Sequence, residues 1–246
     1  MNNESTIYGI RAVIEAANAG RPLSKVLVRQ GLNSPLALEM MGVLKHKGIP
    51  IQHVPAAVFE RFKERNHQGV VAYVGAVKTH MIEEYVPQLQ SEGKQPFLLL
   101  LDRITDVRNF GAIARTAECA GVNGIVVPAK GAANMGADAV KTSAGALMHV
   151  PVCRVGSLKM AALFLKECGV RLVAATEKAQ NPIYSANLRG PLAIVLGAED
   201  TGISPDVLRL CDEQAHIPIL GQIGSLNVSV AAGTVLYEAI RQRKFA

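Results

Sequence analysis

The last thirty residues constrain the fold more than any other stretch of this 246-residue chain. A short apolar strand pattern at 215–217 leads into a loop with Gly221 and Gly224 and then into an apolar, helical pattern. Glycine lets the backbone turn or approach a ligand closely, and Ser225 and Asn227 are residue types that start helices. This ending predicts a strand, an open loop and a docked terminal helix.

The composition is that of a globular protein, with 49% apolar and 19% charged residues. No apolar run reaches the length that spans a membrane. Residues 1–6 lack the basic start and apolar core of a secretory signal, so we expect a cytoplasmic protein. The four cysteines are widely spaced, with no CxxC pair and no nearby histidine cluster. We therefore expect neither a metal site nor a disulfide framework.

Positive charge is concentrated in the first third of the chain. The net charge is +6, and residues 1–80 hold ten Lys and Arg against five Asp and Glu, whereas residues 81–246 hold sixteen against fifteen. This excess indicates that the first part meets a polyanion, most simply nucleic acid, although an excess of lysine also serves solubility alone. Because aromatic residues make up only 4% and Trp is absent, base stacking on an aromatic platform is not the expected mode of binding.

Residues 1–80 alternate between helical and strand patterns. We expect helices within 7–17, 34–46 and 56–65 and strands at 26–28, 51–54 and 70–74. This alternation predicts a small α/β domain. A lone histidine such as His67, just before the last strand, is typical of a turn. Residues 81–95 are polar and contain proline and glycine, so we interpret them as a linker that can include a helical turn.

From residue 96 onward the alternation of strands and helices becomes regular. Strands are expected at 97–102, 125–127, 150–152, 172–175, 192–196 and 215–217, and helices at 109–120, 138–147 and 158–168. The continuous apolar run at 97–101 is typical of a strand buried on both faces. The fold class is therefore α/β, with a parallel sheet covered by helices on both faces.

Three loops that follow strands are the candidates for a site, because parallel sheets bind ligands at the carboxyl ends of their strands. They lie within 101–117, 194–204 and 217–233. The second contains GAEDTG, which is not a P-loop because no Lys-Ser/Thr follows the second glycine. No GxGxxG follows a strand, so neither an ordinary dinucleotide fold nor the usual Rossmann methyltransferase is predicted. A metal-dependent nuclease is disfavoured because no suitable carboxylate cluster is present.

Taken in order, the three loops resemble the three signature motifs of the SpoU (TrmH) family of RNA ribose 2'-O-methyltransferases, within the SPOUT class. The matching stretches read DRITDVRNFGAIARTA, IVLGAEDTGIS and GQIGSLNVSVA. YGIRAV and HQGVVA resemble stretches of the L30e-like RNA-binding domain that precedes the catalytic domain in several members. The whole chain most resembles the bacterial 23S rRNA (guanosine-2'-O-)-methyltransferases. It departs from the family pattern at Val107, where proline is frequent, and at Gly224, where related members often carry a small polar or acidic residue.

The resemblance implies a domain organisation and a fold. Residues 1–80 would form the L30e-like RNA substrate-binding domain, 81–95 the linker and 96–246 the SPOUT catalytic domain. That domain would be an α/β knot, a trefoil-knotted parallel sheet in which the C-terminal chain threads a loop and lines a pocket for S-adenosyl-L-methionine. A homodimer is implied as well, since active sites in this class form near a subunit interface.

The resemblance also implies the residues of the site. The catalytic group carries over to Asn109, Arg115, Glu199, Ser225 and Asn227, and the cofactor pocket to Thr176, Leu196, Gly197, Ile217 and Leu226. Because arginine is effectively always protonated, we expect Arg115 to hold a substrate phosphate and position the 2'-hydroxyl; its action as the base is a competing hypothesis. We expect Glu199 to fix either Arg115 or the first loop.

The expected reaction is methylation of a ribose 2'-hydroxyl in RNA, most simply on a guanosine of 23S rRNA, without a metal. Contacts to RNA phosphates are expected from basic residues, namely Arg11, Arg29, Arg61, Lys63, Arg65 and Lys141. Lys141 begins KTSAGA, which resembles the family stretch KxSxGA and is expected to shape the substrate face. A tRNA substrate is one alternative. A non-catalytic RNA-binding or ribosome-assembly protein is another, against which the intact motif residues argue.

Overall fold

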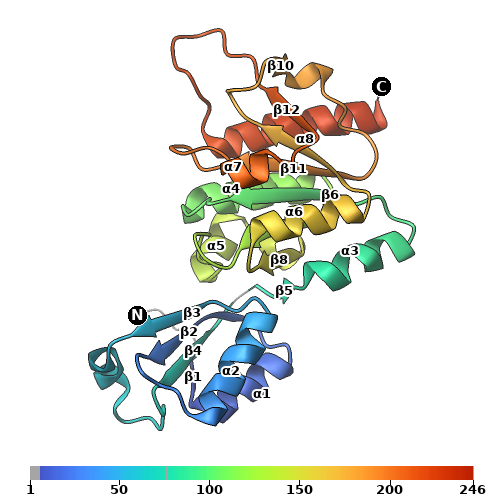
Figure 1. Ribbon diagram of the computed structural model, residues 1–246. Helices are drawn as coiled ribbons and strands as arrows, with labels where there is room; N and C mark the ends of the chain where they lie inside the picture. The colour runs from blue at the N-terminus through green and yellow to red at the C-terminus, as the bar shows by residue number, and fades with distance from the viewer. Residues whose placement is uncertain (1–5, 76, 246) are drawn as a thin grey trace. The chain divides into compact units, whose positions relative to one another are not determined.

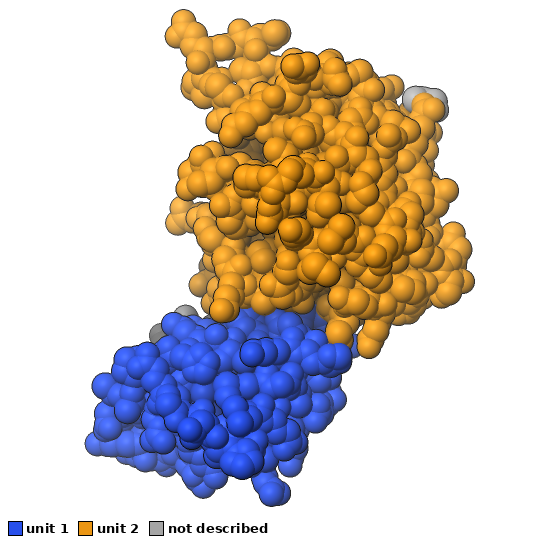
Figure 2. All heavy atoms as spheres, in the orientation of Figure 1, with its two compact units in different colours: residues 1–79, 135–137 blue, residues 80–134, 138–246 orange. Residues whose placement is uncertain are grey.

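The computed structural model describes residues 6–75 and 77–245, and the chain divides into two compact units (Figure 2). Unit 1 comprises residues 1–79 and 135–137, and unit 2 comprises residues 80–134 and 138–246. The described residues form two sheets, one of four strands and one of eight. Within the described ranges, no helix is long and apolar enough to cross a membrane.

Unit 1 is built on a four-stranded sheet of order β1–β4–β2–β3 (Figure 1). Its strands are β1 Thr6–Tyr8, β2 Leu23–Arg29, β3 Ile51–Val54 and β4 Val70–Val74. Its helices are α1 Ile10–Asn18, α2 Pro35–His46 and the 3-10 helix η1 Ala56–Phe62. β2 runs parallel to β3, whereas β4 runs antiparallel to both β1 and β2.

The two faces of this sheet are covered differently, because successive residues of a strand point to opposite faces. On the first face, α1 and α2 bury Val13, Met40 and Leu44 against Val26 and Val28. On the second face, η1 supplies Phe59 to a smaller cluster with Leu27, Val54 and Val71. At the end of the sheet, Nδ1 of His67 accepts a hydrogen bond from the backbone N–H of Gly69 at 2.9 Å, as a turn residue would.

Unit 2 contains an eight-stranded sheet of order β10–β12–β9–β11–β6–β7–β8–β5. The strands are β5 Thr79–His80, β6 Phe97–Asp102, β7 Gly124–Pro128, β8 Val152–Val155, β9 Arg171–Ala175, β10 Asn181–Pro182, β11 Leu192–Gly197 and β12 Glu213–His216. The helices are α3 Ile82–Ser91, α4 Val107–Cys119, α5 Ala137–Thr142, α6 Leu158–Glu167, α7 Pro205–Leu208 and α8 Val228–Lys244, with 3-10 turns η2 Ala146–Met148 and η3 Ile183–Ser185. The seven strands from β10 to β8 pair in parallel.

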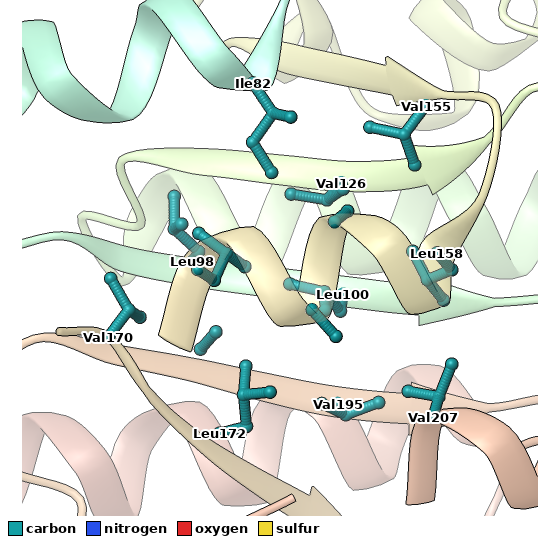
Figure 3. Close-up of a cluster of buried hydrophobic side chains, with 14 of the residues drawn as sticks. Ile82, Leu98, Leu100, Val126, Val155, Leu158, Val170, Leu172, Val195 and Val207 are labelled. Atoms are coloured by element: carbon teal, nitrogen blue, oxygen red, sulfur yellow. The ribbon is translucent and has the colours of Figure 1, made fainter. Parts of the chain in front are cut away.

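The core of unit 2 lies on both sides of β6, which is fully buried. Leu98 and Leu100 point to one face, where they join a cluster with Ile82 of α3, Leu158 of α6 and Val207 of α7 (Figure 3). Helices α4 and α8 pack against each other on the opposite side, and α8 lies against β11. This arrangement confirms the predicted α/β class with a parallel sheet. The knot stays a prediction.

Two segments differ from the sequence expectation. Residues 81–95, interpreted as a linker with a helical turn, contain the ten-residue helix α3, whose Ile82, Val86 and Leu89 are buried. The helix expected at 138–147 is divided into α5 and η2, because Ala144 and Gly145 have positive φ angles of 50° and 87°. A left-handed residue ends a helix, so the second half of the expected helix becomes a tight turn.

Candidate active site

The three predicted loops leave the same edge of the unit 2 sheet. β6 and β11 are neighbours in parallel register, and Asp102 at the end of β6 pairs with Gly197 at the end of β11. β9 and β12 also end together, with Ala175 opposite Ala215. Because the strands are parallel, the loops after β6, β9, β11 and β12 all emerge at the carboxyl edge, where α/β sheets bind ligands.

A carboxylate and two amides join the three loops. Oε1 of Glu199 accepts hydrogen bonds from Nδ2 of Asn109 at 3.2 Å and from Nδ2 of Asn227 at 2.6 Å. Nδ2 of Asn227 also donates to Oδ1 of Asn109 at 3.0 Å. We call these residues the Asn109–Glu199–Asn227 cluster. It brings together three of the five residues predicted as catalytic, from positions far apart in the sequence.

The cluster is built into the starts of two helices. Asp106 caps α4 by accepting from the backbone N–H of Asn109 at 2.8 Å, which fixes the turn that presents the Asn109 amide. Asn227 caps α8 by accepting from the backbone N–H of Ser229 at 2.9 Å, and Oε1 of Glu199 accepts from the N–H of Val228 at 3.1 Å. The positive end of the α8 dipole therefore faces a carboxylate, which is a favourable arrangement.

Arg115 lies on α4, two turns after Asn109, and its side chain is exposed. Among the described residues it has no hydrogen-bond or ion-pair partner, so Glu199 fixes the first loop through Asn109 rather than through Arg115. The neighbouring Thr116 lies close to α8, where a Cβ added to Gly233 would be 3.7 Å from its methyl group. Arg115 thus adjoins, in sequence, a residue of the α4–α8 contact, and its exposed side chain is accessible to a ligand.

A hollow opens beside the cluster. Asn109, Glu199 and Val228 contribute to its wall, together with residues of the first two loops, Arg103, Ile104, Thr105, Asp106, Ala198, Asp200 and Thr201. Its mixture of carboxylates, hydroxyls and a guanidinium suits a polar ligand rather than an apolar one.

Arg103 in this hollow was missed by the sequence reasoning. Its backbone is left-handed, with a φ of 60°. Nη2 donates to the carbonyl of Gly202 at 3.0 Å, and Nε lies 3.4 Å from Oδ1 of Asp102. The other oxygen of Asp102 accepts from the N–H of Ser204 at 2.6 Å. A charged residue directly after a buried strand was the available signal, and left-handed non-glycine residues collect at functional sites.

A second hollow lies at the ends of β9 and β12. It is lined by Ala175, Thr176, Glu177, Ile217, Ile219, Ser225, Leu226 and Ala231. Three of the predicted cofactor residues, Thr176, Ile217 and Leu226, therefore share one hollow. Leu196 and Gly197 lie at the end of β11 and are not part of this lining. Ser225, predicted with the catalytic group, lines this hollow and has no hydrogen bond to the Asn109–Glu199–Asn227 cluster in the described structure.

The predicted RNA-binding residues are all exposed. Arg11 is on α1, Arg29 ends β2, and Arg61 is in η1, with Lys63 and Arg65 just after it. Lys141 lies near the end of α5. The residue that follows it, Thr142, packs on the first loop. There Oγ1 of Thr142 donates to the carbonyl of Val107 at 3.3 Å, and a Cβ added to Gly111 would be 2.2 Å from the Thr142 hydroxyl oxygen.

In the described part of the chain, no group of three His, Cys, Asp or Glu could hold a metal ion.

Comparison with known proteins agrees with this geometry. Residues 96–237 match the SpoU rRNA Methylase family, and residues 6–80 match the RNA 2'-O ribose methyltransferase substrate-binding family. The chain belongs to the SpoU rRNA methylase family.

Two relatives and one solved structure resemble the chain over nearly its full length. The 23S rRNA (guanosine-2'-O-)-methyltransferase RlmB of Escherichia coli K12 is 36% identical, with 96% of this chain and 98% of that protein covered. A Bacillus subtilis protein named provisionally as a TrmH family tRNA/rRNA methyltransferase, YacO, is 35% identical, with 96% and 95% covered. The SpoU methyltransferase AviRb of Streptomyces viridochromogenes, solved with AdoMet, has a TM-score of 0.60 and 26% identity, with 97% and 90% covered.

Proposed function

We propose that this protein transfers the methyl group of S-adenosyl-L-methionine to a ribose 2'-hydroxyl in RNA, on a guanosine of 23S rRNA. The observation that carries the proposal is the Asn109–Glu199–Asn227 cluster, which joins the three family motifs at the carboxyl edge of the sheet. The RlmB relative, similar over nearly all of both chains, supports the choice of RNA.

The second hollow fits the cofactor. Its wall is mainly apolar, with Ile217, Ile219 and Leu226 available to a flat base and the nearly buried Thr176 available as a polar group. Leu196 and Gly197, at the end of β11, would complete the binding site from the neighbouring strand. When bound, the cofactor supplies an electrophilic methyl group. The protein then has to align the acceptor and assist in removing its proton.

We assign the polar hollow beside the cluster to the RNA. Asn109, Glu199 and Asn227 hold its wall in one geometry, and Ser225 borders the cofactor side. Arg115 is exposed and unpaired among the described residues, so it can hold a phosphate with its planar donor fork. Because its guanidinium stays protonated, Arg115 positions the 2'-hydroxyl, and the proton leaves to a phosphate or water. A role for Arg115 as the base is the competing hypothesis.

We assign the roles of the two domains from the distribution of basic residues. Residues 1–80 would bind RNA through Arg11, Arg29, Arg61, Lys63 and Arg65, since cations that neutralise phosphates supply much of the affinity for RNA. Residues 96–246 would hold the catalytic site, with Lys141 on the RNA side. Within the intervening 81–95, helix α3 packs into the core of unit 2 and so joins the catalytic unit structurally. A ribosomal RNA substrate, as named for the RlmB relatives, supports a cytoplasmic location.

A homodimer is supported by an exposed apolar surface at the C-terminus. Val230 and Tyr237, seven residues apart on one side of α8, are each 54% exposed. In the preceding loop Leu220 is fully exposed and Ile223 is 78% exposed. Large apolar side chains exposed in this number mark interaction sites when they form a patch, and a second copy of the chain is the partner we propose to cover them.

The test is transfer of labelled methyl from S-adenosyl-L-methionine to unmodified 23S rRNA and bulk tRNA in parallel, followed by nucleoside analysis. Label as 2'-O-methylguanosine in 23S rRNA is the expected result. Label only in tRNA would identify tRNA as the substrate, an alternative that the name of the B. subtilis relative includes beside rRNA. No transfer and no cofactor binding would identify a non-catalytic RNA-binding or ribosome-assembly protein. Cofactor binding without transfer would point to a ribosomal particle as the substrate.

A further inference from the structure

The second face of the unit 1 sheet gathers the aromatic residues of this unit. Residues 1–80 contain four Tyr and Phe, namely Tyr8, Phe59, Phe62 and Tyr73, and all four belong to or pack against the second-face cluster. Phe59 is buried under η1, whereas the other three rings are only partly buried. The overall aromatic content is low, so this grouping was not visible in the composition.

Strand register places these rings beside a lysine. Tyr73 in β4 pairs with Thr6 of β1 on one side and with Lys25 of β2 on the other. Two residue pairs along, and so on the same face, Tyr8 lies opposite Val71, which itself lies opposite Leu27. The Phe62 ring meets the Tyr8 ring edge-on, with 5.8 Å between their centroids. The three half-buried rings therefore lie on one face, with Tyr8 and Phe62 in contact.

Each of the three accessible rings carries a cation. Nζ of Lys25 lies 4.8 Å from the Tyr73 centroid, the guanidinium of Arg61 lies 4.6 Å from that of Phe62, and the guanidinium of Arg65 lies 5.9 Å from that of Tyr8. Arg61 also donates from Nη2 to the Tyr73 hydroxyl at 2.7 Å. Strong cation–π pairs occur about once per 70–80 residues. Three cation–π pairs on one face of unit 1 indicate that they serve a common function.

The charges on this face are not neutralised. Within the described residues, none of these three cations forms an ion pair with a carboxylate, although Glu60 and Glu64 are exposed in the same segment. Positive charge with three aromatic rings is the chemistry that binds single-stranded nucleic acid: cations follow the phosphates and bases stack on the rings or on guanidinium planes. In a duplex the base faces are already stacked, so such a surface favours unpaired nucleotides.

We propose that Tyr8, Lys25, Arg61, Phe62, Arg65 and Tyr73, together the aromatic–basic face, bind an unpaired segment of the RNA substrate. Bases stack against Tyr73 and Tyr8, displacing or extending the stacked cations, and phosphates bind Lys25, Arg61 and Arg65. The inference rests on the proposed function for the identity of the RNA. It goes further in giving the mode of recognition, which is stacking on a sheet face by unpaired bases.

The first test compares two substitutions at one ring in the full-length protein. Tyr73→Leu removes the ring and should weaken binding of a short unstructured oligoribonucleotide about tenfold, because stacking of one base contributes that much. Tyr73→Phe keeps the ring and should stay within about twofold of the unmodified protein. Affinity for an RNA duplex of the same length should not change in either variant.

The second test isolates charge. Arg65→Gln should lower the slope of log Kd against log salt for the oligoribonucleotide by about 0.7, the value for one phosphate contact on a single strand. Arg21→Gln is the matched control, because Arg21 is exposed in the turn between α1 and β2 and lies over no ring. This pair also covers the case in which Tyr73→Leu does not fold, since both residues are at the surface.

Folded Tyr73→Leu that binds the oligoribonucleotide as tightly as Tyr73→Phe would overturn the aromatic–basic face. Arg65→Gln and Arg21→Gln with equal salt slopes would overturn it as well. Methyl transfer by the unmodified protein, measured in the same preparation, separates this outcome from a failure of the proposed function. Transfer with no effect of Tyr73→Leu refutes the face alone, and the expected binding pattern without transfer refutes the enzyme but supports the face.

Discussion

The side-chain amide of Asn227 donates to Oε1 of Glu199 at 2.6 Å across 28 positions of sequence. The same oxygen accepts from Asn109 and from the first N–H of α8, so one carboxylate oxygen ties two loops and a helix start together. Few other side-chain conformations of these three residues would give every amide donor an acceptor. The geometry of the proposed site therefore depends on Glu199 more than on any other residue of the cluster.

Two substitutions of Glu199 should distinguish the effect of its hydrogen bonds on methyl transfer from the effect of its negative charge. Glu199→Ala removes the acceptor of the Asn109 amide and of the Val228 N–H and one of the two acceptors of the Asn227 amide. We expect methyl transfer to fall about 100-fold, as for other misplacements of catalytic groups. Glu199→Gln retains an oxygen acceptor and should lose less. Single-turnover transfer measures both variants, with Glu167→Ala as the control, because Glu167 is an exposed carboxylate on α6 that lines neither hollow. Transfer by Glu199→Ala at the unmodified rate would remove the cluster from the mechanism.

Arg115→Ala should abolish methyl transfer and leave cofactor binding nearly unchanged. The reason is that Arg115 is exposed, has no partner among the described residues and does not line the second hollow. Arg115→Lys keeps the charge without the planar fork and should retain part of the activity. Calorimetric titration with S-adenosyl-L-methionine gives the binding, and Lys159→Ala on α6 is the control. Retained turnover in Arg115→Ala would refute its assignment.

Gly197→Ala should destabilise the site through the backbone. A Cβ at Gly197 would lie 2.2 Å from the carbonyl carbon of Gly202 and 2.3 Å from the nitrogen of Ile203, and backbone atoms cannot move aside as a flexible side chain can. Overpacking of this kind costs about 1–3 kcal/mol of unfolding free energy. Urea unfolding measures it, with Gly156→Ala as the control because nothing lies within 4 Å of that position. Equal stability of the two variants would show that the loop after β11 is not tightly packed.

Two cysteines should make stability fall at alkaline pH. Burial, and then the charge of Glu83, raise the pKa of Cys153 from 9.0 to about 12. Burial, and then the charge of Asp212, raise the pKa of Cys211 to about 12. The folded state keeps protons that the unfolded state releases above pH 9, so stability is complete below pH 9 and is lost as pH rises towards 12. The slope should be about 1.4 kcal/mol per pH unit for each thiol.

Urea unfolding across the alkaline range tests this dependence. The double variant Cys153→Ala/Cys211→Ala should have a flatter profile, even if the two cavities lower its stability at neutral pH. Cys119→Ala is the control, since Cys119 is exposed. A double variant with the same slope as the unmodified protein would assign the alkaline loss to other groups, such as Tyr85, whose pKa burial raises to about 12.

Tyr237→Lys should weaken the proposed homodimer. Tyr237 is 54% exposed on α8, and a buried aromatic residue at an interface is commonly worth at least about tenfold in affinity. Sedimentation equilibrium gives the dimer dissociation constant. Leu38→Lys is the matched control, because Leu38 is 57% exposed on α2 in the other unit. Equal association of the two variants would exclude α8 as the dimer contact.

Sequence patterns predicted the central strands well because burial dictates composition there. β6 has five successive apolar residues and is found at the predicted bounds. Helix α3 was not predicted as a full helix for a physical reason. It has only three buried apolar residues, Ile82, Val86 and Leu89, and Pro87 lies in its interior. The spacing of those three residues, four and then three apart, was the amphipathic signal.

The candidate site was only partly accessible from sequence. Family motifs pointed to Asn109, Glu199 and Asn227, but no pattern states that one oxygen of Glu199 accepts from both amides. Ser225, two residues before Asn227, was grouped with them and instead lines the hollow at the ends of β9 and β12. Arg103 was not predicted as a residue of the site, because a left-handed backbone at a non-glycine residue results from tertiary structure rather than from local propensity.

The position of Asn227 in the chain has a consequence for how the protein is made. The buried clusters of unit 1 draw only on residues from 7 to 74, so they are complete once the first third of the chain has been synthesised. Domains fold as units, beginning with the N-terminal one. The amide that closes the Glu199 cluster belongs to residue 227, far beyond that point of the chain. A growing chain can thus acquire a folded RNA-binding unit well before it possesses the site that would modify the RNA.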